Sequence, residues 1–290
     1  MALVQHTQSY LFSSDPANGA LNRSPDGSTF SVQLDSPIQV PRNAVNATIE
    51  VTSAEIWWTI PNISARLGNN LLYLYSEAPA GVPVTATITI QDGLYSVEGL
   101  AASISTELAT LGLPTNLISL GGDDATQKAI ITYNNGGFRT YLDFTQPNTF
   151  RGILGFDSRV SPALADQSTD GYPDFGDSVA EFNTISSFLI NSDLVSAGIP
   201  LNSINGGVLS KVDIGSTPTG RLITFRPYIP SVVSASELIG SGKNAFSFRL
   251  TDQRRNLVDT NSEYYSFELH LKWYIPHTQS NAGMHSGTHR

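Results

Sequence analysis

The sequence predicts a mainly β protein built from antiparallel sheets, and three observations lead to this fold class. First, apolar and polar residues alternate strictly in 246–250 and 265–273 near the C-terminus, as in strands with one face on a core and the other in water. Second, Thr, Val, Ile and aromatic residues are common while charged residues make up only 14% of the chain. Third, only 94–111 repeats its apolar residues at helical spacing.

The N-terminal part predicts a polar arm followed by two strands. Residues 1–28 contain the turn clusters DPANG and SPDGS, and we expect an arm with at most one short strand at 9–12. Residues 30–34 alternate as a strand. The segment 45–60 is the longest strand candidate, but its apolar residues change parity part-way. Such a change is what a β-bulge produces, so we expect a bulge within 52–55.

The middle of the chain predicts a mixed α/β segment. Two short strands are expected at 71–75 and 87–90, ahead of the helix. Ser96 is suited to cap the helix N-terminus, and Gly112-Leu113-Pro114 is a stop signal. The strands at 129–133 and 140–144 flank NNGGFR and are predicted to pair as a hairpin.

A short helical turn and a polar loop complete the middle segment. Residues 147–156 are predicted to form the turn, which starts at Pro147 and closes at Gly155. The loop 158–177 is rich in Asp, Pro, Gly and Ser.

The sequence again predicts β-strands after residue 184. Strands are expected at 185–190, 206–214, 221–229, 246–250 and 265–273. Pro227 and Pro230 restrict the third of these to a sheet edge or a short ladder. The last residues have no apolar period and are expected to form a tail.

These segments predict a sandwich that is interrupted by a second domain. About seven strands before residue 64 and after 184 suffice to close one sandwich. The predicted organisation is an N-terminal arm (1–28), a β domain (29–64 plus 183–276), an inserted mixed α/β domain (65–182) and a flexible tail (277–290).

Composition excludes several classes of function. The net charge is −9 and no Lys/Arg cluster is present, so direct binding to nucleic acid is not expected. The chain has no cysteine, no N-terminal signal-peptide pattern and no apolar run approaching the ~20 residues of a membrane span.

Acidic residues in one loop are the main candidates for a cation site. Asp166, Asp170, Asp174 and Asp177 could surround a hard cation such as calcium. Their spacing is not that of an EF-hand, and an ordinary acidic surface loop is the competing interpretation. Whether the Asp166–Asp177 loop binds a cation is left open.

The remaining candidates favour structural roles. Gly121-Gly122-Asp123-Asp124 is predicted to be a turn, because neither a helix nor a Lys-Ser/Thr pair follows it. In Trp57-Trp58 and Tyr264-Tyr265, one aromatic of each pair is expected in the core and the other exposed. The histidines of the tail (His277, His285, His289), together with His6, are not expected to bind a metal. We therefore predict no catalytic, cofactor or metal residues and no enzyme activity.

Three segments resemble parts of the jelly-roll capsid proteins of icosahedral DNA viruses, especially the penton-type minor capsid proteins of virophages and polinton-like viruses. They are TITIQDGLYSVEGLAASISTEL (87–108), FRGILGF (150–156) and the two final strands in 246–274. In that family a single eight-stranded jelly roll carries an insertion domain between two of its strands. The resemblance implies such a fold here, with 65–182 as the insertion.

The resemblance also implies a function. It predicts a structural protein of the virion, assembled in the host cell, that forms homopentamers at the fivefold vertices next to trimers of the major capsid protein. The insertion is then a candidate for contact with a host receptor.

Two alternatives remain at this point. A double jelly-roll major capsid protein would split near residue 160 and form pseudo-hexagonal trimers. A β-sandwich module of a tail or adhesin would bind carbohydrate instead.

Overall fold

The computed structural model describes residues 2–78, 81–182, 185–200 and 207–276. The chain divides into two compact units. We call Met1–Trp58 with Ile185–Arg290 the flanking unit, and Thr59–Thr184 the central unit. Strands dominate both, which confirms the mainly β class. Among the described residues, neither helix has the length and hydrophobicity needed to cross a bilayer.

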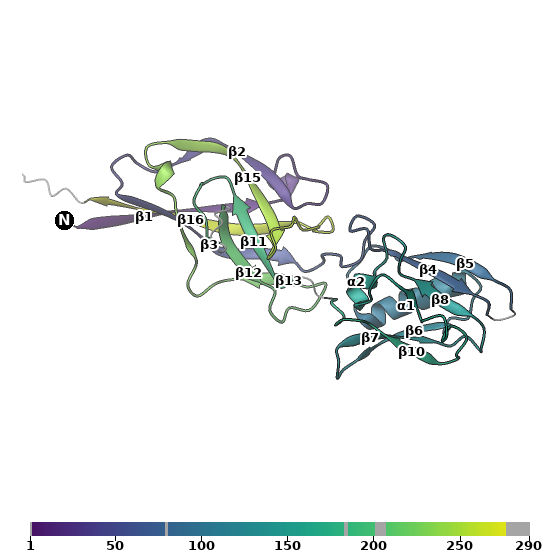
Figure 1. Cartoon of the computed structure of the whole chain (residues 1–290). Helices are drawn as coiled ribbons and strands as arrows, with labels where there is room; N and C mark the ends of the chain where they lie inside the picture. Colours follow the sequence, from purple (N-terminus) through teal and green to yellow (C-terminus); the bar gives the residue numbers. More distant parts are fainter. Residues whose placement is uncertain (1, 79–80, 183–184, 201–206, 277–290) are drawn as a thin grey trace, which may run out of the picture. The chain divides into compact units, whose positions relative to one another are not determined.

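The flanking unit is a sandwich of two antiparallel sheets (Figure 1). The first sheet has the order β1-β16-β3-β13, with β14 also paired to β3. The second has the order β12-β11-β15-β2. The strands of the first sheet are β1 (Leu3–Ser13), β3 (Asn46–Trp57), β13 (Leu222–Phe225), β14 (Val232–Ser234) and β16 (Tyr265–Pro276). Those of the second are β2 (Thr29–Gln39), β11 (Ser187–Ser192), β12 (Val208–Asp213) and β15 (Gly242–Asp252).

The strand pairing of this unit is that of a jelly roll. The first strand pairs with the last, β1 with β16, and the second pairs with the second-last, β2 with β15. Further in, β3 pairs with β13 and β14, and β11 with β12. A ribbon of such antiparallel pairs, rolled so that alternate pairs fall in opposite sheets, is the jelly-roll arrangement.

Aromatic side chains fill the space between the two sheets. Phe248 of β15 is fully buried, and its ring lies 4.8 Å from those of Phe12 and Phe267 and 5.3 Å from that of Phe30. These rings come from both sheets and from both ends of the chain. Offset and edge-to-face ring contacts stabilise such clusters beyond the area they bury.

The expected bulge in the longest strand is confirmed. Ser53 pairs with Glu268 but Val51 pairs with Leu269, so Thr52 is the extra residue of β3. The bulge reverses the parity of the strand. As a result Val51 on one side of it and Ala54 on the other are both buried.

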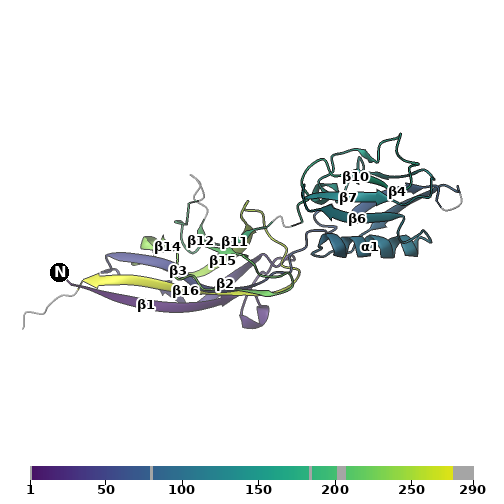
Figure 2. The same cartoon turned by 90° about the horizontal axis from the view of Figure 1, so that it is seen from below.

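The central unit has its own core between two smaller sheets (Figure 2). The sheet orders are β10-β7-β6 and β5-β4-β8-β9. The strands are β4 (Leu71–Ser76), β5 (Val84–Thr89), β6 (Ile118–Asp123), β7 (Lys128–Tyr133), β8 (Thr140–Asp143), β9 (Val160–Ser161) and β10 (Tyr172–Phe175). Helix α1 (Val97–Thr110) runs beside β6 and β5 and contributes Leu100, Ile104 and Leu108 to the core.

Local signals in the central unit act as predicted. Ser96 caps α1, because its hydroxyl accepts a hydrogen bond from the amide of Gly99 at 3.2 Å. The short helix α2 (Arg151–Leu154) ends at Gly155 with φ of 76°. A Cβ atom at this position would collide with the carbonyl oxygen of Ser178, so the turn requires glycine.

One buried amide joins the beginning and the end of the central unit. The Nδ2 group of Asn62 donates hydrogen bonds to the carbonyl oxygens of Tyr95 (2.8 Å) and Phe182 (2.9 Å). Its Oδ1 atom accepts one from the amide of Tyr95 at 2.8 Å. Asn62 therefore links the segment through which the chain enters this unit to the segment through which it leaves.

The structure differs from the sequence-based expectations in the N-terminal arm and in the predicted hairpin of the central unit. The predicted arm 1–28 contains an 11-residue strand, β1, which pairs along its whole length with β16. β7 and β8 do not form a hairpin: β7 pairs with β6 and β10, whereas β8 pairs with β4 and β9. The last two strands, β15 and β16, face each other from opposite sheets.

The aromatic cluster leads to a prediction for Phe248→Ala. The change removes a fully buried ring, and we expect the flanking unit to lose about 3–5 kcal/mol of unfolding free energy. All three tryptophans (Trp57, Trp58, Trp273) belong to this unit, so tryptophan fluorescence during urea unfolding reports on it alone. Phe144→Ala, which empties the core of the central unit, is the control and should leave this transition in place. An unchanged midpoint for Phe248→Ala would contradict the role of the cluster.

Candidate functional site

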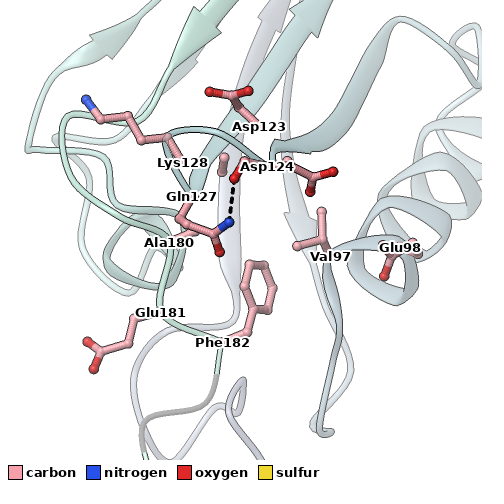
Figure 3. Close-up of a pocket in the computed structure, with 11 residues that line it drawn as sticks. Val97, Glu98, Asp123, Asp124, Gln127, Lys128, Ala180, Glu181 and Phe182 are labelled. Carbon is pink, nitrogen blue, oxygen red and sulfur yellow. Dashed lines mark hydrogen bonds between the residues drawn. The ribbon is translucent and has the colours of Figure 1, made fainter.

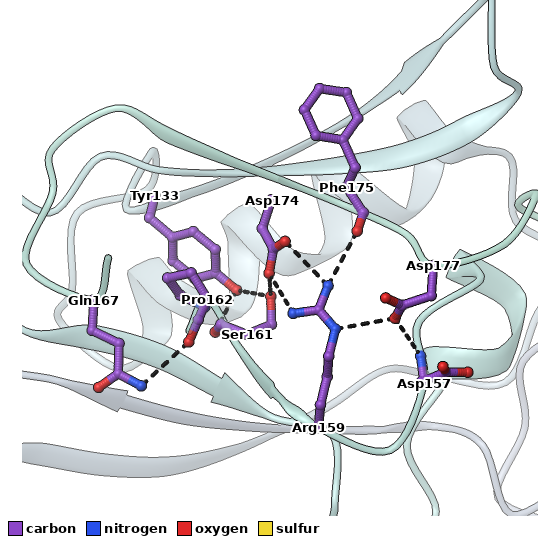
Figure 4. A network of polar contacts seen from close by, with 9 residues as sticks. All are labelled: Tyr133, Asp157, Arg159, Ser161, Pro162, Gln167, Asp174, Phe175 and Asp177. Atoms are coloured by element: carbon purple, nitrogen blue, oxygen red, sulfur yellow. Dashed lines mark hydrogen bonds and ion pairs between the residues drawn. The ribbon is translucent and has the colours of Figure 1, made fainter. Parts of the chain in front are cut away.

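The acidic loop predicted as a possible cation site is organised by an arginine (Figure 4). Arg159 donates through both terminal nitrogens to Asp174, at 2.8 and 3.1 Å, and through Nε to Asp177 at 3.0 Å. A fourth hydrogen bond reaches the carbonyl oxygen of Phe175. The guanidinium group thus lies between two of the carboxylates that a cation would have needed.

The other two acidic residues of the loop face elsewhere. Asp170 accepts a hydrogen bond from the amide of Gly136 at 2.8 Å. Asp166 interacts with Tyr172, and the burial of Tyr172 together with this negative charge raises the pKa of the phenol. Within the described residues, no group of three or more His, Asp or Glu side chains is arranged to hold a metal ion.

The ionisation of the arginine cluster follows from its contacts. Hydrogen bonds to Asp174 raise the pKa of Arg159 above its ordinary value. For Asp177, partial burial raises the pKa, but the amide of Asp157 and the guanidinium of Arg159 outweigh it and the net shift is downward. Arg159 and Asp177 are therefore both charged at neutral pH.

A serine and a tyrosine extend this cluster into the core. The hydroxyl of Ser161 donates to Asp174 at 2.6 Å, and the hydroxyl of Tyr133 donates to the carbonyl oxygen of Ser161 at 2.7 Å. Tyr133 is completely buried, and burial raises its pKa well above the usual value. A serine activated for nucleophilic attack would donate to a base, usually histidine. Here it donates to a carboxylate already paired with arginine, so the arrangement joins β7, β9 and β10 and has no catalytic geometry.

A cavity of about 440 Å³ lies in the central unit (Figure 3). It opens between the N-terminus of α1, the β6–β7 turn and residues 180–182, and four carboxylates line it: Glu98, Asp123, Asp124 and Glu181. The backbone amide of Glu98 at the helix N-terminus lowers the pKa of that carboxyl. The hydroxyl of Thr126 lowers the pKa of Asp123. Two ionised carboxylates are unsuited to donate a proton as general acids.

The cavity also tests the predicted Gly121–Asp124 turn. Gly121, Gly122 and Asp123 complete strand β6, and the side chain of Asp123 then accepts from the amides of Ala125 and Thr126. The glycines lie in a strand, and the surrounding charge is negative, so the segment does not cradle phosphate.

The aromatic pairs lie as predicted. Trp58 is 5% exposed and packs edge-on against Phe188, whereas Trp57 is 39% exposed. Tyr265 is buried, and Tyr264 is 45% exposed under the guanidinium of Arg23. The expectation that one aromatic of each pair is buried and the other exposed is confirmed in both pairs.

The histidines within the described residues occupy strand positions. His6 stacks on Trp273 at 5.6 Å, and His270 lies 3.1 Å from Glu268. His277, His285 and His289 lie outside the described residues.

Sequence reasoning missed one surface feature of the central unit. Tyr73, Tyr75 and Tyr141 lie on the outer face of the sheet β5-β4-β8-β9, opposite the core residues Leu72 and Leu74. The alternation in LLYLY was a usable signal. The outer residues of this segment are as bulky as the inner ones, however, so the pattern did not show which face of the strand is exposed.

Comparison with solved structures found a likeness in fold, whereas comparison of the sequence found no match. No protein-family model matches the sequence, and no curated protein sequence matches it. The crystal structure of the selenomethionine-labelled mavirus penton protein is similar: the alignment covers 93% of this chain and 100% of that chain, with 14% sequence identity and a TM-score of 0.45.

The arginine cluster predicts that Arg159→Lys destabilises the central unit. A lysine cannot reproduce the paired bonds to Asp174 together with the bond to Asp177, and both sites are partly shielded from water. We expect the unfolding free energy to fall by about 1–3 kcal/mol. Amide hydrogen exchange of β7, β9 and β10 measures this loss. Lys211→Gln, which breaks an exposed ion pair with Asp213, is the control and should cost under about 1 kcal/mol.

The lowered pKa of Asp177 predicts a pH dependence. Its folded-state pKa lies below the unfolded value, so the stabilisation is complete above about pH 4 and is lost as pH falls through the folded pKa. The melting temperature of the central unit should therefore fall steeply as the pH drops below about 4. In Asp177→Asn it should fall less steeply. Equal slopes for the two proteins would contradict this assignment.

Proposed function

We propose that the protein is a structural capsid protein of the virion that forms homopentamers at fivefold vertices. The observation that carries this proposal is the jelly-roll strand order of the flanking unit, β1-β16-β3-β13 facing β12-β11-β15-β2. Jelly rolls are the recurrent fold of viral capsid proteins, although lectins and cupins share it. The choice among these functions therefore depends on the surface of the unit.

The flanking unit exposes neighbouring apolar side chains in the segment that joins β13 to β14. Between β13 and β14, Tyr228 is 99% and Ile229 is 79% exposed, and Val232 follows them. Exposed neighbouring apolar residues indicate a protein contact, and tyrosine is enriched among interface residues that carry binding energy.

One edge of the sandwich supports the same interpretation. Natural proteins protect sheet edges with proline, charge or bulges. β2 contains Pro37 and an irregular register, β12 carries Lys211 and Asp213, and prolines interrupt the edge between β13 and β14. The fourth edge, β1, has 11 residues with neither proline nor a charged Asp, Glu, Lys or Arg. An unprotected edge of this length is suited to contact with another protein chain.

Cyclic assembly explains why such surfaces would not cause aggregation. A heterologous contact between two different patches repeats around a ring until it closes, which leaves both patches covered. In line with the family resemblance of the sequence, we propose that this ring is a pentamer with trimers of the major capsid protein as its neighbours, and that the central unit is the candidate for receptor contact. The net charge of −9 favours protein partners over nucleic acid.

The two alternative functions fare differently. A double jelly roll needs a second eight-stranded barrel, but the central unit has sheets of three and four strands with α1 beside β6 and β5. The strands that precede and follow the central unit in the sequence share one sandwich. The carbohydrate-binding alternative has one supporting observation, the tyrosine face of the central unit. That face is compatible with a capsid role of the flanking unit.

The proposal predicts the oligomeric state of the purified protein. Native mass spectrometry should find a species of five protomers, and Tyr228→Ser with Ile229→Ser should shift it to monomers because the apolar contact is lost. Both side chains are exposed, so the protomer should stay folded by circular dichroism. Leu164→Ser, at a 74% exposed leucine of the central unit, is the matched control and should leave the ring intact. A wild-type trimer or monomer across the micromolar range would contradict the pentamer.

A further inference from the structure

The outer face of the sheet β5-β4-β8-β9 carries an ordered row of aromatic and hydroxyl side chains. Tyr75 of β4 is paired in register with Thr85 of β5 and with Tyr141 of β8. One step along, Tyr73 is paired with Thr87. Because side chains alternate across a strand, these residues share the face opposite the buried leucines.

Polar contacts hold the tyrosine rings in place. The rings of Tyr75 and Tyr141 are stacked, with centroids 4.9 Å apart and an interplanar angle of 15°. The guanidinium carbon of Arg139 lies 5.5 and 5.2 Å from these two rings, and its Nε donates to Gln167 at 2.8 Å. The hydroxyl of Tyr75 donates to Glu77 at 2.8 Å, which raises the pKa of the phenol and keeps it protonated.

A cavity of about 250 Å³ lies on this face. The three tyrosines, Thr85, Asp143 and Gln146 line it, with Leu74 behind them. Asp143 accepts from the amide of Thr145 at 3.0 Å and from Nε2 of Gln146 at 2.8 Å. Its carboxylate and the neighbouring amide are thereby fixed in orientation while their remaining lone pairs and N–H group can bond a ligand.

The chemistry of this lining selects one class of ligand. Flat aromatic faces fit the apolar face of a ring, and the carboxylate, amide and hydroxyl groups fit hydroxyls at its rim. The charged groups already have partners inside the protein: Arg139 lies over the tyrosines, Glu77 binds Tyr75, and Asp143 binds Thr145 and Gln146. Asp143 keeps its negative charge, because the groups that bond it are neutral, so the cavity would repel an anionic sugar and accept a neutral one.

We propose that the cavity between Tyr73, Tyr75, Tyr141, Asp143 and Gln146 binds a neutral hexose of a glycan. The tyrosines supply the stacking surface, and Asp143 and Gln146 bond the sugar hydroxyls. The site belongs to the central unit alone, so the proposal does not rest on the pentamer and stands or falls separately from it.

The experiment is saturation-transfer-difference NMR on the full-length protein with four soluble probes: glucose, galactose, mannose and N-acetylglucosamine. At least one should receive magnetisation, with tyrosine signals of the protein perturbed at millimolar sugar. Tyr141→Ala and Asp143→Asn should each weaken that binding by tenfold or more. Tyr228→Ala, at the exposed tyrosine of the flanking unit, is the matched aromatic control and should bind as the wild type does.

A second variant separates loss of binding from loss of folding. Thr85 is exposed on β5, so Thr85→Lys should obstruct the cavity without disturbing the core, and it should abolish binding at an unchanged melting temperature. The proposal is overturned if none of the four sugars binds, or if binding persists in both Tyr141→Ala and Thr85→Lys.

Discussion

The fold depends on the antiparallel ladder that joins the two ends of the chain. β16 lies between β1 and β3, so nearly every backbone group along the last strand is bonded to strands more than 200 residues earlier. Pairing at such separation costs chain entropy before any contact forms. The aromatic rings of Phe12, Phe248 and Phe267 offset that cost, because they meet only when both sheets are assembled.

The interruption of this ladder by the central unit is tolerated for a physical reason. Loop-closure entropy grows slowly with length, and a segment that folds on its own core adds even less. Asn62 bonds the entering segment to Phe182 near the exit, and Trp58 packs against Phe188 inside the flanking unit. Contacts within each unit therefore fix the chain segments that connect it to the other unit. β3 and β11, which flank the central unit in the sequence, keep their places in opposite sheets.

Local patterns predicted the elements better than their partners. The bulge at Thr52, the cap at Ser96 and the glycine stop at Gly155 are each determined by a few neighbouring residues. The prediction that β7 and β8 pair was wrong. The turn signal NNGG is local, whereas the partner of each strand is determined by packing against residues that are distant in the sequence. Only residues 9–12 of β1 were predicted as a strand, because most side chains of β1 are exposed. The strand is held by backbone bonds to β16, which leave no trace in a hydrophobic pattern.

The sites were harder to predict than the fold because they depend on where side chains point. Four aspartates in one loop suggested a cation, and only the structure places Arg159 between two of them. The same holds for the tyrosine face, whose members lie almost 70 residues apart along the chain. Assembly and recognition make opposite demands on a surface: one needs apolar groups that become covered, the other a rigid site that stays open. A chain divided into units with separate cores can meet both, because side chains exposed on one unit can change without disturbing the packing of the other.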